Sequence, residues 1–331
     1  MNKLLITGAA GFIGTNCALE LRDDFELFLV DNFSRSGSEK NADILKAAGL
    51  NVVKLDVANR ELLNSFMQDV GTLSVVLHLA AQTSLLESLK NPVLDFDCNA
   101  LGTINILEYL RVYNPECKGI FLSSNKVYGN LNEISFIQKG KRFTPNGPVA
   151  AFSEDLPILP SGGYSISKSI SDSYVQEYGK RYSMPLVSLR QSAVYGQYQN
   201  PRSDQGWVVH FLREMSDGNT LHLRGAGLQV RDILFVQDFI ELVRKIIAAK
   251  PSFGGFFNVG GGVNNTLSIL ELLDLYTDIT GKPVKFETAI MDPEDQKYFV
   301  SNNQKIQDYT GWEPKISPRQ GVEFVLENIN L

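Results

Sequence analysis

Apolar runs alternate with amphipathic segments over the first 190 residues, which predicts alternating strands and helices. Short, continuous apolar runs predict strands at 3–7, 26–30, 51–55, 74–79, 118–122 and 185–190. Segments of helical periodicity lie between them, near 12–22, 38–48, 60–68, 92–113 and 164–182. Because the strands lack polar alternation, we expect both of their faces to be buried. The pattern predicts an α/β fold with a doubly wound parallel sheet, whose ligands bind at the carboxyl ends of the strands.

A glycine-rich turn joins the first predicted strand to the first predicted helix. Its spacing is G-x-x-G-x-x-G: Gly8 permits a tight turn, Gly11 lets the backbone approach a pyrophosphate, and Gly14 lets helix and strand pack closely. The helix begins with Phe12 and Ile13, where unpaired N–H groups and the positive end of the helix dipole face an anion. With the strand before it and the helix after it, the turn predicts a dinucleotide site.

An acid ends the second predicted strand, at Asp31 and Asn32. A carboxylate at this place hydrogen-bonds the ribose hydroxyls and repels a 2′-phosphate, which favours NAD over NADP. Ser34 and Arg35 follow on the same loop. Because an arginine can accept a 2′-phosphate, the loop leaves NADP open as an alternative.

Short motifs also follow the third and fourth predicted strands, where we expect the adenine and a flat ring to lie against the backbone. Ordinary packing of a strand-to-helix loop is the alternative reading of each motif. The residues concerned are Asp56, Val57, Leu79, Ala80, Ala81 and Gln82. Asn99 lies within the following predicted helix, where asparagine is locally unfavourable. We expect Asn99 to bond a neighbouring segment, either beside the cofactor or for structural reasons alone.

Ser124 ends the fifth predicted strand, and Tyr164-x-x-x-Lys168 opens the helix near 164–182. Residues four apart share one helix face, so the phenol and the ammonium group point into the same cleft. A tyrosine acting as a base near neutral pH needs its pKa lowered by about 3 units. We expect the positive charges of Lys168 and of oxidised nicotinamide to lower it, and Ser124 to hold the reacting hydroxyl.

The segment from 130 to 163 contains several prolines and little periodicity. Loops of this length inside a compact domain are usually lids or binding loops, so we expect one here, with a disordered insertion as the alternative. Its basic residues, Lys139, Lys141 and Arg142, are interpreted as a solvated run.

After residue 190 the regular alternation stops. Further strands are expected near 230–236 and 256–260, and helices after 207 and near 268–280 and 318–328. We expect residues 1–190 to form the dinucleotide-binding domain, with its sheet completed by segments of 229–260. Residues 191–331 are expected to form a smaller, discontinuous substrate-binding lobe. Arg231 in this region suits a phosphate ligand, because a diphosphate needs a fixed bidentate donor, although a structural arginine is the alternative.

Composition narrows the range of partners. The 331-residue chain has a net charge of −6, which argues against nucleic acid or a membrane surface as the main partner. Its cysteines, Cys17, Cys98 and Cys117, are scattered and odd in number, as is typical of reduced core thiols in a cytoplasmic protein. The first strand begins too early to leave room for a signal peptide, and no apolar run is long enough to span a bilayer. Three unclustered histidines predict no metal site.

Taken together, these motifs resemble the extended short-chain dehydrogenase/reductase family, whose sheet is Rossmann-like, and the resemblance covers essentially the whole chain. Within that family the chain is similar to the nucleotide-sugar epimerases, and more closely to the CDP-tyvelose (CDP-paratose) 2-epimerases. The closer likeness rests on Ser-Ser-Asn-Lys-Val-Tyr-Gly at 123–129, Asp-Gln-Gly-Trp at 204–207 and Gly-Leu-Gln-Val-Arg-Asp at 227–232. Homo-oligomers are common in the family, which makes one an expectation here.

The resemblance implies a catalytic triad of Ser124, Tyr164 and Lys168. In such enzymes Tyr164 would remove a hydroxyl proton while NAD takes the hydride from carbon 2 of a CDP-linked dideoxyhexose. The ketone then presents its other face and receives the hydride back, so NAD is not consumed and is expected to be held tightly. The resemblance also implies that Arg231 grips the nucleotide diphosphate. The expected substrate-binding residues are Thr83, Ser124, Asn125, Gln205, Gly206, Trp207, Arg231 and Asp295.

Other functions are also compatible with the sequence. The nearest is a 4-epimerase acting on a UDP-hexose, with the same chemistry at another carbon. A nucleotide-sugar 4,6-dehydratase is disfavoured, because loss of water needs an added acid/base pair and Asn125 and Lys126 follow the serine instead. A reductase that exchanges cofactor in every cycle is a further alternative. A nucleotide-sensing scaffold is the last, although a sensor has no need of the serine, tyrosine and lysine.

Overall fold

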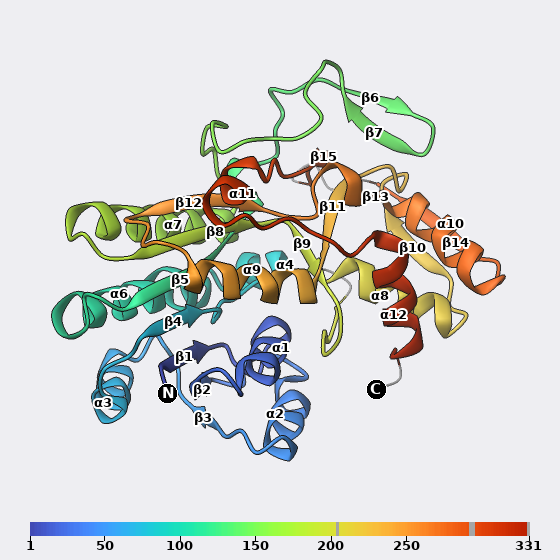
Figure 1. Ribbon diagram of the computed structural model, residues 1–331. Coiled ribbons are helices and arrows are strands. Elements are labelled where there is room, and N and C mark those ends of the chain that lie inside the picture. The colour runs from blue at the N-terminus through green and yellow to red at the C-terminus, as the bar shows by residue number, and fades with distance from the viewer. Residues whose placement is uncertain (203–204, 291–294, 330–331) are drawn as a thin grey trace.

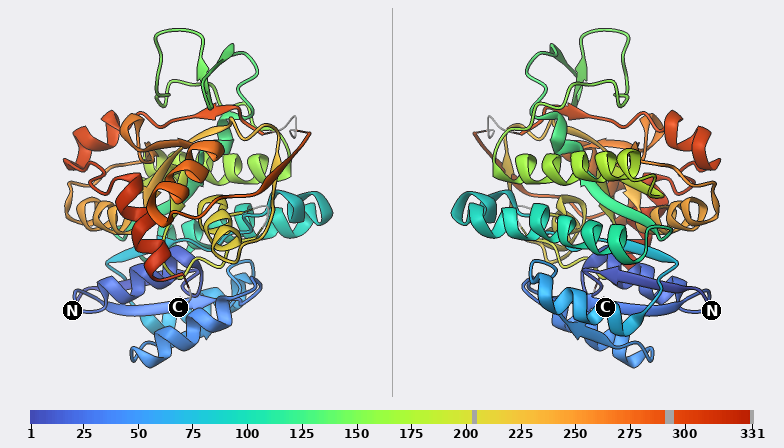
Figure 2. Two further views of the ribbon diagram at one scale, coloured as in Figure 1. Left: turned by 90° about the vertical axis from the view of Figure 1, so that its right-hand side faces the viewer. Right: turned by 90° about the vertical axis from the view of Figure 1, so that its left-hand side faces the viewer.

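The computed structural model describes residues 1–202, 205–290 and 295–329 (Figures 1 and 2). Within these ranges seven parallel strands form one sheet, in the order β12-β8-β5-β4-β1-β2-β3. Their bounds are Lys3–Thr7 (β1), Glu26–Asp31 (β2), Val52–Lys54 (β3), Val75–His78 (β4), Lys118–Ser124 (β5), Leu186–Gln191 (β8) and Gly255–Val259 (β12). Since β1 lies inside the sheet and the chain winds outward in both directions, the predicted doubly wound α/β fold is confirmed.

Helices cover both faces of this sheet, as the uninterrupted apolar strands predict. Leu4 and Ile6 of β1 pack on one side with α1, α2 and α9, whereas Leu5 between them packs on the other side with α3, α6 and α7. Neighbouring residues of one strand therefore belong to two separate cores. The helices are α1 (Phe12–Leu21), α2 (Ser38–Ala47), α3 (Arg60–Val70), α6 (Gly102–Tyr113), α7 (Gly163–Arg181), α9 (Val236–Ala248) and α11 (Gln304–Thr310).

The helix expected at 92–113 is interrupted. The structure contains α4 (Leu85–Lys90), α5 (Pro92–Phe96), a π-helical turn at Asp97–Leu101 and then α6. The wider turn places Asn99 where its side chain bonds neighbouring segments, and π-helical turns are frequent at functional sites. Periodicity alone could not reveal this single-turn change.

Segments after residue 192 form a second, mixed sheet in the region that we expect to be the substrate-binding lobe, and this region is called the lobe below. In that sheet β11 pairs with β9, β13 and β15. Of the segments within 229–260 that we expected to complete the main sheet, β12 joins it, whereas β11 lies in the lobe. The lobe elements are β9 (Ala193–Tyr195), α8 (Trp207–Ser216), β10 (Leu221–Arg224), β11 (Val230–Phe235), a 3-10 turn (Val263–Asn265), β13 (Thr266–Ser268), α10 (Ile269–Thr280), β14 (Phe286–Ala289), β15 (Tyr298–Phe299) and α12 (Pro318–Glu327).

The long segment between β5 and α7 is ordered, and only Lys126 near its start lines the cavity described below. It begins with a 3-10 turn, η2 (Asn125–Tyr128), and contains the hairpin of β6 (Phe136–Lys139) and β7 (Arg142–Pro145), which projects at the top of Figure 1. Arg142 pairs with Glu271 at 2.6 Å and Lys141 with Asp274 at 2.7 Å, so the hairpin is docked on α10. The described cavity lining includes no residue of 130–163, so the expected lid or binding loop does not line the cavity in this structure.

A buried ion pair fixes α7 to the sheet. Arg190 on β8 and Asp172 on α7 are 2.7 Å apart and both almost inaccessible to solvent. Asp172 also accepts hydrogen bonds from Ser188 and Gln176, and Arg190 donates one to Tyr128 of η2. This network satisfies a pair of charges that would be costly to bury alone, and it ties α7 to the end of β5.

Candidate active site

A cavity of about 620 Å³ opens at the carboxyl ends of the main-sheet strands, beside the lobe. It brings together predicted residues that lie far apart in the sequence. The predicted residues in its lining are Gly8, Gly11, Phe12, Ile13, Gly14, Asp31, Asn32, Ser34, Arg35, Asp56, Val57, Leu79, Ala80, Ala81, Gln82, Thr83, Ser124, Tyr164, Lys168, Gln205, Gly206 and Trp207. The described lining does not include Asn99, Asn125, Arg231 or Asp295. Asp204, which opens the predicted motif at 204–207, lies outside the described residues.

The glycine-rich turn makes a cradle with no room for side chains. Gly8 has a φ of +67°, and a Cβ there would lie 2.7 Å from the backbone nitrogen of Ala80. A Cβ on Gly14 would lie 2.2 Å from the carbonyl oxygen of Gly8. Gly11 caps α1, no side chain bonds the helix N-terminus, and the first turn holds no acid. This end of α1 is therefore open to the pyrophosphate of a dinucleotide.

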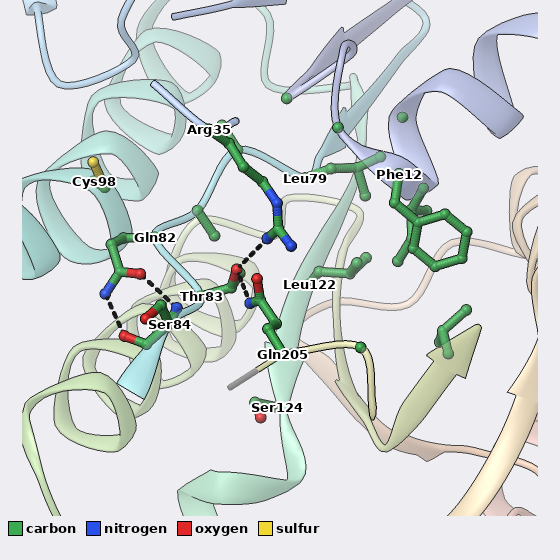
Figure 3. Close-up of a pocket in the computed structure, with 18 of the residues that line it drawn as sticks. Phe12, Arg35, Leu79, Gln82, Thr83, Ser84, Cys98, Leu122, Ser124 and Gln205 are labelled. Carbon is green, nitrogen blue, oxygen red and sulfur yellow. Dashed lines mark hydrogen bonds between the residues drawn. The ribbon is translucent and has the colours of Figure 1, made fainter. Parts of the chain in front are cut away.

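Asp31 lies beside that cradle and is nearly buried. Its carboxylate accepts hydrogen bonds from the backbone N–H groups of Ala10 at 3.0 Å and Phe33 at 2.8 Å. Burial raises the pKa of this carboxyl, and these bonds act against that rise. Arg35 extends across the cavity and donates to Thr83 at 2.9 Å (Figure 3). Arg35 also donates to the carbonyl of Asn200 at 3.4 Å, so its guanidinium bonds groups of the protein, an arrangement that suits NAD at Asp31.

Four residues that line the cavity each have one buried polar atom with no hydrogen-bond partner within the described protein. The atoms are Ser123 Oγ, Gln191 Oε1, Gln199 Oε1 and Trp207 Nε1. Buried polar groups are nearly always paired with protein, ligand or ordered water, so these atoms are candidates for bonding a polar ligand. The cradle, the acid and the unpaired atoms all fit a dinucleotide with a second polar ligand beside it.

The predicted triad converges at the end of β5. Ser124 and Tyr164 both line the cavity there. Lys168 follows one turn after Tyr164 on α7, is buried, and donates to the Leu122 carbonyl at 2.5 Å. Gly162 precedes α7 with a φ of +80°, a conformation that other residues rarely adopt. The spacing of four residues therefore places the phenol and the ammonium group in one cleft, as predicted.

The ionisation of this pair differs from the prediction. Burial raises the pKa of Tyr164; the hydrogen bond with Ser124 acts against that rise and the charge of Asp95 adds to it. Burial also lowers the pKa of Lys168 to about 8, although Asp172 and Asp95 favour its charge. In the protein alone the pKa of Tyr164 is therefore not lowered. The predicted lowering needs the positive charge of oxidised nicotinamide in addition to that of Lys168.

Asp95 is a residue of this site that sequence reasoning missed. Its buried carboxylate accepts hydrogen bonds from Gln82 at 2.7 Å and from Ser167 at 2.6 Å. Asn99 donates to Ser167 at 2.9 Å and to the carbonyl of Gln82 at 3.0 Å. The cluster joins the loop after β4 to the first turns of α7. In the sequence, Asp95 is an ordinary acid in a predicted helix, and no local signal marks it.

A second cluster of polar side chains includes those of the two residues that follow Ser124. Arg231 Nη2 is 2.8 Å from Asp295 Oδ1, and Lys126 Nζ is 3.4 Å from the same oxygen. Asn125 donates to Gln296 at 3.0 Å. These contacts connect the end of β5 with the lobe, next to the cavity.

Other polar groups have structural partners. His78 lies between Thr7 at 2.7 Å and Thr103 at 3.2 Å, and burial lowers its pKa to about 3, so it is neutral. Asp56 accepts a hydrogen bond from Asn32 at 2.9 Å.

Throughout the described ranges, no group of three or more histidine, cysteine or acidic residues could hold a metal ion. In the same ranges, no helix is both long and apolar enough to cross a membrane.

Comparisons with known proteins agree with this geometry. Residues 4–260 match the NAD dependent epimerase/dehydratase family. The CDP-paratose 2-epimerase of Salmonella typhi is 35% identical over 97% of either chain. UDP-glucose 4-epimerase of Thermotoga maritima, solved with UDP-glucose, is 26% identical with a TM-score of 0.84, over 99% of this chain and 98% of that one. The UDP-glucose 4-epimerase of Thermus thermophilus, solved in complex with NAD, is 28% identical with a TM-score of 0.82, over 99% of each chain.

Proposed function

The chain belongs to the NAD-dependent epimerase/dehydratase family, and on this basis we propose that it interconverts CDP-paratose and CDP-tyvelose by inverting carbon 2 of the sugar. At the level of the family, it is an NAD-dependent enzyme of the nucleotide-sugar epimerase type, an isomerase. The observation that carries the finer proposal is the 35% identity with CDP-paratose 2-epimerase over nearly the whole length of both chains.

In this proposal the main-sheet domain holds the cofactor and the lobe holds the nucleotide sugar. The glycine cradle binds the pyrophosphate of NAD, and Asp31 binds the adenosine ribose. When bound, NAD supplies an acceptor that takes a hydride from the sugar carbon and returns it. Tyr164 takes the proton of the reacting hydroxyl and gives it back, Ser124 orients that hydroxyl, and Lys168 favours the phenolate by its charge. Since the proton and the hydride both return, the reaction leaves no net redox change.

The two residues after Ser124 support epimerisation over dehydration. Loss of water from a sugar needs an acid to protonate the leaving hydroxyl. Here Asn125 pairs with Gln296 and Lys126 with Asp295, so the turn after the serine supplies no carboxylic acid. Inversion at carbon 4 of a UDP-hexose is the second candidate, because both solved structures described above are UDP-glucose 4-epimerases.

A panel of CDP- and UDP-sugars tests the proposal. The NAD-loaded enzyme is incubated with each sugar in ordinary and in deuterated water, and the sugar configuration is followed by NMR. We expect inversion at carbon 2 of CDP-paratose and CDP-tyvelose, no deuterium in the product and no net change in NADH absorbance. Inversion only at carbon 4 of a UDP-hexose would support the second candidate. Net formation of NADH would exclude both.

Turnover is expected to fall as the pH rises through about 8, because buried Lys168 loses its charge there. Below that pH the ammonium is present and favours the phenolate; above it this support is lost. In Lys168→Arg the guanidinium stays charged, so the alkaline fall should move to higher pH, at a lower overall rate. Rate profiles against pH for both proteins provide the measurement. An unmoved alkaline midpoint in the variant would assign the fall to another group.

We also propose that two copies of the chain associate through α4, α5 and α7. Large apolar side chains are exposed on these helices and the π-helical turn, and such patches mark interaction sites. They are Leu89, Val93, Phe96, Leu101 and Ile166. Analytical ultracentrifugation should give the mass of a dimer for the native chain and of a monomer for Val93→Glu. A native mass of one chain would contradict the proposal.

A further inference from the structure

Two cations share one carboxylate oxygen at the lobe side of the site. Asp295 Oδ1 is 2.8 Å from Arg231 Nη2 and 3.4 Å from Lys126 Nζ. The side chains of Arg231 and Lys126 are only 13% and 17% exposed. Because both approach the same atom, the guanidinium and the ammonium group are separated by no more than the sum of those two distances. They form a localised pair of cations on an otherwise acidic protein.

The backbone around this cluster is held firmly and next to the reacting serine. Lys126 lines the cavity, and its backbone N–H donates to Ser124 Oγ at 3.2 Å. On either side of the ion pairs, Asn125 donates to Gln296 at 3.0 Å, and Gln296 donates to the carbonyl of Gly129 at 2.6 Å. These contacts hold residues 125 and 126 against residues 295 and 296. Lys126 is held between the position proposed for the sugar hydroxyl, at Ser124, and the diphosphate ligand proposed at Arg231.

The charges of the cluster suit an incoming anion. Burial opposes the charge of Asp295, but Arg231 and Lys126 together hold the pKa of its carboxyl below the usual value. The carboxylate of Asp295 is thus shared between two cations. A nucleotide-sugar diphosphate carries negative charge on both phosphoryl groups. Arginine binds phosphate through a bidentate fork and lysine binds it as a point charge, so the two side chains suit two neighbouring phosphoryl groups.

We propose that Lys126 is a second diphosphate ligand that acts together with Arg231, and that Asp295 is the counter-ion of both cations until the diphosphate replaces it. The inference rests on the proposed function, because it places a nucleotide diphosphate at this side of the cavity. It also changes the expected role of Asp295, from a direct substrate ligand to a group that keeps the two cations in position and competes with the substrate.

Calorimetric binding of CDP, UDP and CMP to the NAD-loaded protein tests this assignment. Lys126→Met should weaken CDP and UDP about tenfold, equivalent to about 1.4 kcal/mol, and weaken CMP much less. Lys126→Arg should retain most of the affinity. Asp295→Asn should strengthen CDP and UDP binding, because it removes the competing charge. The matched control is Lys141→Met, which removes a lysine from an exposed ion pair with Asp274 on the surface and should change none of the three affinities.

Two results would overturn the assignment. Unchanged CDP and UDP affinity in Lys126→Met would show that Lys126 does not bind the diphosphate. Weaker binding in Asp295→Asn would show that Asp295 is itself a ligand and not a competing counter-ion. The test also separates this assignment from the proposed substrate. If the native protein binds UDP and not CDP, the proposed cytidine substrate fails, while a tenfold loss of UDP affinity in Lys126→Met would still support the role of Lys126.

Discussion

Replacing Tyr164 by phenylalanine should lower turnover by about 10²- to 10⁴-fold, the usual contribution of a positioned general base. The change removes only the phenolic oxygen, the atom that is proposed to take the proton. The ring still fills its place on α7, and the glycine cradle and Asp31 are untouched. We therefore expect the variant to purify with as much NAD as the native protein. The measurements are the rate of sugar inversion and the NAD released from denatured enzyme.

The matched control for this prediction is Tyr182→Phe. Tyr182 follows the last residue of the same helix, is 44% exposed and contacts the ring of Tyr178. The same loss of a hydroxyl there should leave the inversion rate unchanged. Undiminished turnover in Tyr164→Phe would remove the tyrosine from its proposed role. A loss of NAD from that variant would instead assign the ring to cofactor binding.

Gly14→Ala should sharply reduce NAD content and lower the melting temperature. The new methyl group would lie 2.2 Å from the Gly8 carbonyl oxygen and 2.7 Å from Ala9 Cα. Both are backbone atoms of the turn, so the turn itself must move to relieve the overlap. Overpacking of this kind costs about 1–3 kcal/mol or more, and here the displaced backbone is also the proposed pyrophosphate cradle. NAD content per chain and thermal unfolding are the two measurements.

Gly147→Ala is the comparison for that variant. Gly147 lies in the segment between β7 and α7, and a Cβ added there meets nothing within 4 Å. The same chemical change should leave NAD content and melting temperature as they are. Full NAD loading in Gly14→Ala would show that the turn can widen without loss of its ligand, and would contradict the proposed cradle.

The parts of the site that follow directly from short sequence motifs could be predicted. The glycines at 8, 11 and 14, Asp31 at the end of β2 and the Tyr164 and Lys168 pair all line one cavity. Each motif is local: a turn needs glycine, a strand end presents its next residue, and positions four apart share a helix face. A parallel sheet then gathers the carboxyl ends of its strands at one edge, so the motifs meet without further information.

The ionisation state and the supporting network could not be predicted in this way. The pKa of Tyr164 depends on how much solvent the finished structure excludes, and the sequence contains no measure of that. Asp95 joins this hydrogen-bond network only when the π-helical turn, the loop after β4 and α7 pack together in the folded chain. The length and the prolines of the segment at 130–163 predicted a lid or binding loop, yet its hairpin pairs with α10 and its residues do not line the cavity.

The sheet, the glycine cradle, the acid at the end of β2 and the positions of the serine, tyrosine and lysine follow from local sequence, because each depends on neighbours a few residues away. Which charged groups contact the same atom, and which groups are shielded from water, follows only from the packing of distant segments. Lys126, Arg231 and Asp295 are more than 60 residues apart in the sequence, and their shared contact exists only because the lobe packs on the end of β5. Electrostatic interactions depend on distance and burial, which are properties of the folded chain.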